Sequence, residues 1–229
     1  MGLSHAGRPQ PASGDPRKPQ RLWPLIPGPH GAAAHPSSPL CVALVAIMDD
    51  MVTEFLWSSA GFALSPLFEY IWHARIAHGP REHATRTEHL EHHRTAHTVT
   101  DPFVEMRANL GRVGLSMALV NLVAIPLFGL RRSLSLSAGL TAGYAFSTLY
   151  HAQMHIRGPR GAYEDFMWRF HWHHHAADSR VNFGLTNPVF DFAFGTAVVP
   201  ERVIISERMA PAWVDGQTPG FEIRRRVNT

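Results

Sequence analysis

Histidines gather in four short clusters along this chain. Ten of the 16 histidines lie in these clusters, each beside an apolar segment long enough to approach a membrane span. Neutral imidazole is the commonest protein ligand for transition metals, and ten such ligands are too many for one ion. The pattern therefore predicts a membrane enzyme with two metal ions. The ten candidate ligands are His73, His78, His89, His92, His93, His151, His155, His171, His174 and His175.

The spacing inside the clusters indicates how the imidazoles could converge. Residues i, i+3 and i+4 share one face of an α-helix, so His89, His92 and His93 are predicted to point together. The same relation holds for His171, His174 and His175, and His151 and His155 form an i, i+4 pair.

The pair His73 and His78 does not fit a helical face. Five residues correspond to a rotation of roughly 140° around an ideal helix. We expect this pair to converge where the helix ends between the two residues, and Gly79-Pro80 supplies a stop signal.

Six histidines lie outside this candidate set. His97 continues the His89 and His93 stripe and could enter a site, whereas His173 is out of register with His171 and is interpreted as a supporting or surface group. The role of His83 is left open by the sequence. The remaining three, which are interpreted as ordinary polar residues, are His5, His30 and His35.

Composition divides the chain into three parts. Half of the 18 prolines lie in the first 39 residues, where Pro, Gly, Ala and Ser dominate, so residues 1–50 are predicted to be a disordered extension. The apolar run Leu40–Met48 inside it is too short to span a bilayer. Residues 51–200 are predicted to form a membrane-embedded catalytic domain, and residues 201–229 a polar C-terminal tail.

Three apolar segments follow the extension, at residues 52–72, 113–130 and 134–150. Their lengths lie in the lower part of the range that crosses a hydrocarbon core of roughly 30 Å. The alternative is a set of buried helices in a soluble all-α protein. Two uncharged runs separated only by Arg131, Arg132 and Ser133 favour the membrane. A fourth segment, 183–199, is broken by Asn187-Pro188 and is predicted to be interfacial or re-entrant.

These segments predict an all-α fold of about three to four hydrophobic segments with a helical cap that carries the metal site. The short connector makes the second and third segments a hairpin, which places all ten histidines on one side of the membrane. Arginines near the spans are more numerous on that side, so the positive-inside bias predicts that the cap is cytoplasmic. They are Arg75, Arg81, Arg86, Arg94, Arg107, Arg112, Arg157, Arg160 and Arg169.

Two features limit the chemistry. Cys41 is the only cysteine, so neither an intrachain disulfide nor a thiolate-bound iron–sulfur centre can form. The formal net charge is +3, but the basic residues are scattered arginines and form no basic run with aromatic residues between them. Nucleic acid is therefore not the expected partner. The sequence does not specify an oligomeric state.

The four boxes, in order, resemble those of a known superfamily. HARIAH (73–78), HLEHH (89–93), HAQMH (151–155) and HWHHH (171–175) are similar to the HxxxxH, HxxHH, HxxxH and HxxHH boxes of the fatty acid hydroxylase and sterol desaturase superfamily. The segment VNFGLTNPVFDFAFGT (181–196) is similar to the one that follows the last box there. The resemblance covers about residues 52–210.

The resemblance implies an O2-dependent oxidoreductase that hydroxylates or desaturates a fatty acyl or sterol-like lipid. It implies two iron ions as cofactors, held by the ten histidines, with zinc able to replace iron in preparations. O2 is the implied co-substrate, and the external electron donor is expected to be a separate protein, because this chain has no segment for a fused haem domain. Residue identities do not distinguish hydroxylation from desaturation.

Three alternatives stay open at the level of sequence. A carotenoid hydroxylase uses comparable boxes, although the gap from His78 to His89 and the 181–196 segment favour acyl lipids or sterols. A histidine-rich metal-binding or transport membrane protein, or a zinc hydrolase, belongs to another class. A zinc hydrolase needs only about three ligands, an open position and a nearby base.

An all-imidazole site supplies no negative charge of its own, so nearby carboxylates are candidates for balancing the metal ions. Small residues of the third segment, Ala138, Gly139, Ala142 and Gly143, either leave room for a lipid tail or let helices pack closely. The candidate carboxylates are Glu88, Glu91, Glu164, Asp165, Asp178 and Asp191.

Overall fold

The computed structural model describes residues 38–225 and is mostly helical, with 69% of these residues in helices and 4% in strands. The chain divides into two units, residues 1–43 and 44–229, and the ten histidines belong to the second. The elements are α1 (Pro39–Ile71), the π-helix η1 (Trp72–Ala77), α2 (Ala84–Thr95), η2 (Ala96–Thr98), α3 (Val104–Phe128), α4 (Leu130–Ile156), α5 (Ala162–Ala176), α6 (Val189–Phe194), β1 (Val203–Ser206), η3 (Glu207–Met209) and β2 (Phe221–Arg224).

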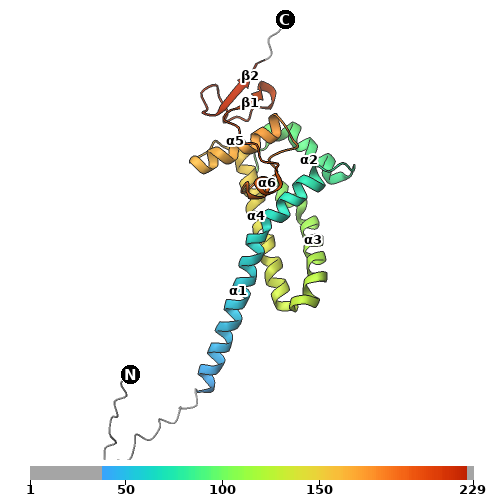
Figure 1. Ribbon diagram of the computed structural model, residues 1–229, viewed down its shortest axis with the longest axis vertical. Helices are drawn as coiled ribbons and strands as arrows, with labels where there is room; N and C mark the ends of the chain where they lie inside the picture. Colours follow the sequence, from blue (N-terminus) through green and yellow to red (C-terminus); the bar gives the residue numbers. More distant parts are fainter. Residues whose placement is uncertain (1–37, 226–229) are drawn as a thin grey trace, which may run out of the picture. The chain divides into compact units, whose positions relative to one another are not determined.

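Helices α3 and α4 form the predicted hairpin (Figure 1). The turn lies at Gly129 rather than at Arg131–Ser133, because Gly129 adopts a φ of +83°, which a residue without a side chain tolerates best. The Ser133 hydroxyl donates to the Gly129 carbonyl at 2.7 Å. Within the hairpin, Asn121 Nδ2 donates to Ser137 Oγ at 2.8 Å.

Glycines allow α1 and α4 to approach each other closely. A Cβ atom on Gly139 would overlap the carbonyl oxygen of Ser58, and one on Gly61 would overlap that of Leu136. Ser58 Oγ also donates to the Ser135 carbonyl at 3.0 Å. Gly139 therefore packs α4 against α1, as close packing predicts, whereas Ala138 and Ala142 are exposed beside this contact and line a shallow hollow with Phe62.

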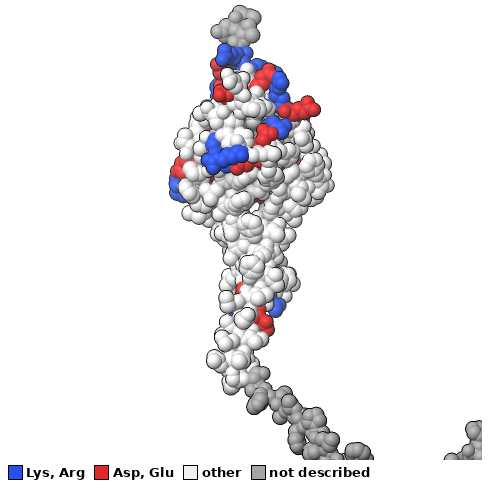
Figure 2. Space-filling model, turned by 90° about the vertical axis from the view of Figure 1, so that its left-hand side faces the viewer, with Lys and Arg blue, Asp and Glu red and all other residues white. Residues whose placement is uncertain are grey.

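One helix among the described residues, α3, is long and apolar enough to cross a membrane. Its apolar side chains are exposed on several sides, with Leu115 64% and Leu122 71% exposed, a pattern that is costly in water and suits lipid. Figure 2 shows one face of the molecule, on which charged side chains gather in the upper part of the view and are sparse in the lower part. Helices α1 and α4 do not meet the same criterion, so the predicted number of spans stays a prediction.

Helix α1 begins before the predicted domain boundary. The run Leu40–Met48 was expected to lie inside a disordered extension, but it forms part of a helix that starts at Pro39. Only Asp49, Asp50 and Met51 separate this run from the next apolar segment, and none of them is a proline or glycine, so helical hydrogen bonding has no reason to stop at residue 50. The rest of the predicted extension, residues 1–37, lies outside the described residues.

The C-terminal segment is folded, which corrects the prediction of a polar tail. Strands β1 and β2 pair in parallel, with Val203 opposite Phe221 and Ile205 opposite Ile223. Val203, Ile205 and Phe221 are buried in one apolar cluster with side chains of α5 such as Trp168. The strands have only four residues each, so their alternation is too short to be recognised in the sequence.

We predict that this sheet contributes to stability through its buried face. Replacing Ile205, which is 0% exposed, by alanine should lower the free energy of unfolding by about 2–5 kcal/mol. The matched control is Ile204→Ala in the same strand, because Ile204 is 40% exposed and should change stability by about 0.5 kcal/mol or less. Denaturant titration in detergent measures both, and equal losses would contradict the assignment of the two faces.

A second prediction concerns the contact between α1 and α4. Gly139→Ala places a methyl group against the backbone of α1 and should reduce the yield of folded, membrane-inserted protein. Gly114→Ala on α3 is the control, because no atom lies within 4 Å of the new Cβ and alanine favours the helix by about 1 kcal/mol. Size-exclusion chromatography of the detergent-solubilised proteins measures the difference. Equal yields of the two variants would argue against close packing.

Candidate metal centre

Five histidines converge in a first group, here called cluster A. Their nearest ring nitrogens lie within 4.8 Å of one another. The Nε2 atom of His78 lies 2.9 Å from that of His89, 3.1 Å from that of His93 and 3.0 Å from that of His174. His73 Nε2 lies 3.0 Å from His89 Nε2. Cluster A thus consists of His73, His78, His89, His93 and His174.

The other five histidines form a second group, cluster B. Ring nitrogens of His92, His151, His155 and His175 lie within 4.8 Å of one another. His171 joins them, because its Nε2 lies 3.1 Å from His155 Nε2. His155 Nε2 is also 3.0 Å from His151 Nε2. All ten histidines predicted as ligands are therefore brought together by the structure, five in each cluster.

The two clusters are neighbours because adjacent residues serve both. On α2, His92 belongs to cluster B and His93 to cluster A, and the rings of His93 and His175 stack with centroids 4.1 Å apart. On α5, His174 belongs to cluster A and His175 to cluster B. The prediction that the three histidines of each HxxHH box point together is wrong, because each box supplies histidines to both clusters. Successive residues project about 100° apart, so a histidine pair in sequence can reach two centres at once.

A π-helical turn brings His73 and His78 together. Residues 72–77 follow α1 as a π-helix, and His78 N donates to the His73 carbonyl at 3.0 Å. A bond from i to i+5 places residues five apart one above the other, which an α-helix does not. The helix does end beside His78, as expected, but the wider turn aligns the two rings.

Backbone carbonyls orient two rings of cluster A. His73 Nδ1 lies 2.6 Å from the Phe183 carbonyl oxygen, and His174 Nδ1 lies 2.6 Å from that of Val181. A carbonyl oxygen only accepts, so each Nδ1 carries the hydrogen and each Nε2 keeps a free lone pair. Ligating histidines in metal sites are held in the same way.

The loop that supplies these carbonyls is anchored by buried side chains. Asp191, 0% exposed, accepts hydrogen bonds from the backbone N–H groups of Phe183 and Gly184, both at 2.7 Å. Asn182 adopts a φ of +59°, which asparagine tolerates better than most residues, and its Nδ2 donates to the Phe170 carbonyl at 2.9 Å. Asp191 therefore supports the histidines through the loop and does not touch them.

Glu105 is the carboxylate that sequence reasoning missed. It lies in the first turn of α3, with Oε2 3.0 Å from His151 Nδ1 and Oε1 3.3 Å from His92 Nδ1. One feature of the sequence could have identified it: Glu105 is the only acidic residue between Asp101 and Glu164.

The acids that were proposed instead make other bonds. Five are in ion pairs with arginines, and the sixth, Asp191, holds the loop. The pairs are Glu88 with Arg112, Glu91 with Arg94, Glu164 with Arg157, Asp165 with Arg169, and Asp178 with Arg180.

Other histidines lie outside both clusters. His83 caps the N-terminus of α2, where its Nδ1 accepts from Arg86 N at 3.2 Å. His97 lies in η2 and belongs to neither cluster, so the structure does not place it in the site. His173 lies in α5 among the cluster residues but belongs to neither cluster. The predictions for His5, His30 and His35 fall outside the described residues.

The residues of both clusters fit divalent metal ions. Within residues 38–225, His92 Nε2 and both ring nitrogens of His175 are buried without a hydrogen-bond partner. Two nitrogens bound at about 2.1 Å and at right angles on one ion would be about 3.0 Å apart, close to the separations seen here. Converging lone pairs at this distance repel unless a cation lies between them.

Burial lowers the pKa of most of these imidazoles and so favours the neutral form, which binds metal. It lowers the pKa of His78 and of His92 to about 4 and that of His93 to about 2, because the charged ring loses its hydration. Like-charge repulsion within the clusters adds to the effect for His93. The pKa is also lowered, in each case first by burial, for His73, His89, His171, His174 and His175.

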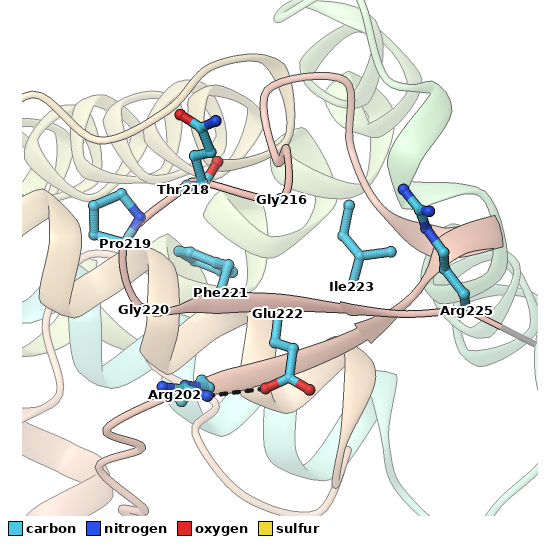
Figure 3. A pocket seen from close by; sticks show the side chains of 10 residues that line it. Arg202, Gly216, Thr218, Pro219, Gly220, Phe221, Glu222, Ile223 and Arg225 are labelled. Atoms are coloured by element: carbon cyan, nitrogen blue, oxygen red, sulfur yellow. Dashed lines mark hydrogen bonds and ion pairs between the residues drawn. The ribbon is translucent and has the colours of Figure 1, made fainter.

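A pocket elsewhere in the fold has no relation to these clusters. It lies beside β2 and is lined by the loop of residues 216–220 together with Arg202 and Phe221 (Figure 3). Arg202 is paired there with Glu222 at 3.0 Å. None of the ten histidines lines this pocket, so we assign it no part in the metal chemistry.

Two adjacent five-histidine clusters in a helical fold with an apolar hairpin define a histidine-rich site compatible with metal ions, and comparison with known proteins identifies the family. The fatty acid hydroxylase family model matches residues 58–196, and the chain belongs to this family. A solved structure described as full-length Scs7p, with only the hydroxylase domain visible, is 18% identical with a TM-score of 0.49. The match covers 72% of this chain and 67% of that one. A comparison with curated protein sequences returns no match.

Protonation of the clusters predicts how stability depends on pH. The pKa of His78 and His92 falls from 6.5 to about 4 on folding, so the unfolded chain binds more protons between these values. The free energy of unfolding of metal-free protein should therefore be highest above pH 6.5 and fall as the pH drops towards 4. Thermal unfolding across this range measures the slope.

A variant tests whether the clusters cause this slope. His78→Gln removes one of the titrating groups and should make the dependence shallower, whereas His97→Gln, outside both clusters, should leave it unchanged. A slope that is the same in all three proteins would exclude the clusters as its source.

Proposed function

We propose that this protein is an O2-dependent lipid hydroxylase with a histidine-ligated di-iron centre. The observation that carries the proposal is the convergence of ten imidazoles, seven of them buried, into two adjacent five-histidine clusters, in a member of the fatty acid hydroxylase family. Imidazole suits iron as well as zinc. Two ions so close together could share the electrons needed to reduce O2.

In this proposal each cluster holds one iron ion. His73 and His174 present Nε2 to cluster A because backbone carbonyls bind their Nδ1–H groups. His151 presents Nε2 to cluster B because Glu105 Oε2 accepts from its Nδ1–H group, and Glu105 Oε1 lies 3.3 Å from His92 Nδ1. When bound, the iron ions would supply the oxidising power to break an unactivated C–H bond with O2.

The protein around the clusters excludes water from this chemistry. His171 and His174 are 0% exposed, and Trp168, Phe170 and Trp172 of the same helix are also fully buried. A dry site protects reactive oxygen species from side reactions with solvent and strengthens electrostatic interactions.

Electrons are proposed to come from a separate protein. The chain has a single cysteine, Cys41, which is exposed on α1 and distant in sequence from every histidine box. The chain therefore cannot assemble an iron–sulfur centre from its own thiolates. An external electron-transfer protein is the proposed donor, and O2 is the co-substrate.

A lipid is the proposed substrate because the clusters adjoin an apolar hairpin. His151 and His155 lie at the C-terminal end of α4, and Glu105 begins α3, so the centre lies at the end of the hairpin where these two helix ends meet. Members of the family are membrane-associated. An acyl or sterol-like chain in the bilayer could then bring a C–H bond to the centre.

We further propose that the metal centre lies on the cytoplasmic side. The basic residues that flank the hairpin at the end carrying the clusters support this orientation, because positive residues are retained on the cytoplasmic face. Two of them, Arg107 and Arg112, lie in the first turns of α3. Arg131 and Arg132 lie at the opposite end and are fewer.

Metal analysis and lipid analysis test the proposed function together. Protein purified anaerobically from iron-replete cells should contain about two iron atoms per chain, as the two clusters require. Cells that express it with a reductase system should accumulate an oxidised lipid detectable by mass spectrometry. His155→Ala should reduce the iron content and abolish the product, because His155 belongs to cluster B.

His173→Ala is the matched control for this experiment. It removes an imidazole from the same box as His171 and His174 but outside both clusters, so iron content and product should be retained. A single tightly bound zinc ion that does not exchange for iron would contradict the oxygenase. Iron binding without any oxidised lipid would favour metal storage or transport instead.

A further inference from the structure

The two clusters differ in what holds their ligands. In cluster A the oriented Nδ1–H groups, those of His73 and His174, donate to neutral backbone carbonyls. In cluster B the oriented groups of His92 and His151 face a single carboxylate. Backbone carbonyls carry only a partial charge, whereas an ionised carboxylate carries a full one.

The Glu105 carboxylate lies between two imidazoles of cluster B. Its two oxygens contact different imidazoles, Oε2 at 3.0 Å from His151 Nδ1 and Oε1 at 3.3 Å from His92 Nδ1. These histidines come from α4 and α2, and Glu105 itself comes from α3, so one side chain connects three helices. Its side chain is 28% exposed, while those of His92 and His151 are 13% and 5% exposed.

No other carboxylate among the described residues is placed in this way. The acidic residues nearest in sequence to the boxes are engaged elsewhere, Glu88 with Arg112 and Glu91 with Arg94. Asp191 acts on the loop backbone. Glu105 lies in the first turn of α3, where the helix dipole favours its negative charge.

We infer that Glu105 is a positioning residue that makes the two metal sites inequivalent, by orienting His92 and His151 and adding negative charge to cluster B alone. The inference rests on the proposed dimetal centre. A carboxylate on Nδ1–H makes the opposite nitrogen a stronger donor, so the ion in cluster B is held more tightly through Glu105 than its ligands alone would hold it.

A glutamine at this position separates charge from shape. Glu105→Gln preserves the size of the side chain but removes its charge and has one carbonyl oxygen, so only one of the two imidazoles can face an oxygen atom. The amide NH2 group would then face the other Nδ1–H, and two donors would meet. Loss of such an outer partner typically costs about 10–100-fold in metal affinity.

The experiment is a zinc titration of the full-length, metal-stripped protein in detergent, in competition with a chromogenic chelator. The wild type should bind two ions per chain. Glu105→Gln should bind one ion as the wild type does and the other about 10–100-fold more weakly. Glu105→Asp retains the charge and should bind the weakened ion more tightly than the glutamine variant.

The matched control is Glu88→Gln, which makes the same chemical change in α2, next to His89, but removes only a surface ion pair with Arg112. It should leave both affinities unchanged. Combining Glu105→Gln with His151→Ala should cost less than the sum of the two single changes, because residues in one network are not additive.

Several outcomes would overturn the inference. Unchanged affinities in Glu105→Gln, equal weakening of both ions, or an aspartate variant no better than glutamine would each exclude a charge that acts on cluster B alone. A wild type that binds fewer than two ions would remove the dimetal centre and this inference together. Since zinc binding requires no turnover, the expected titration without any lipid product would reject only the proposed reaction.

Discussion

Ten imidazoles, seven of them buried, whose ring nitrogens converge at two neighbouring points are the constraint on which this structure depends. Neutral rings whose lone pairs converge at about 3 Å do not attract one another, and protonated rings would repel more strongly. The pKa of His78 and His92 is lowered to about 4, so charging the rings does not relieve the conflict near neutral pH. Divalent cations would resolve it, because each lone pair would then become a ligand.

The helices are arranged so that no single element carries a whole cluster. Residues 73–78, which comprise most of η1 and the residue after it, supply two histidines to cluster A, α4 supplies two to cluster B, and α2 and α5 supply three each, divided between the clusters. Metal binding would therefore connect four helical segments that are distant in sequence. Because the binding free energy of such ions is also folding free energy, the helices around the centre would gain stability from the ligands they share.

The surroundings of the centre divide into a polar and an apolar side. Helix α5 directs His171, His174 and His175 to the clusters, while Trp168 packs against Ile205 and Phe221 of the C-terminal sheet. Trp172 Nε1 donates to the Met154 carbonyl at 3.0 Å, which joins α5 to α4 just before His155. The C-terminal segment thus buries the apolar side of α5, the helix that carries three of the ten histidines, although it contributes no histidine itself.

The order and spacing of the histidine boxes were sufficient to predict the ten converging residues, the helical fold and the family, because ligand type and helical period are local properties of the chain. The apolar hairpin was also predictable from two long uncharged runs. These features need no knowledge of how distant segments pack.

Tertiary structure decided the rest. Whether His92 and His93 serve one centre or two depends on where α4 and α5 lie around α2, and the alignment of His73 with His78 depends on a π-turn that composition does not reveal. Glu105 became recognisable only when α3 brought it beside rings from two other helices. The four-residue strands of the C-terminal sheet are stabilised by burial against α5, a contact made across the fold and therefore absent from any local pattern.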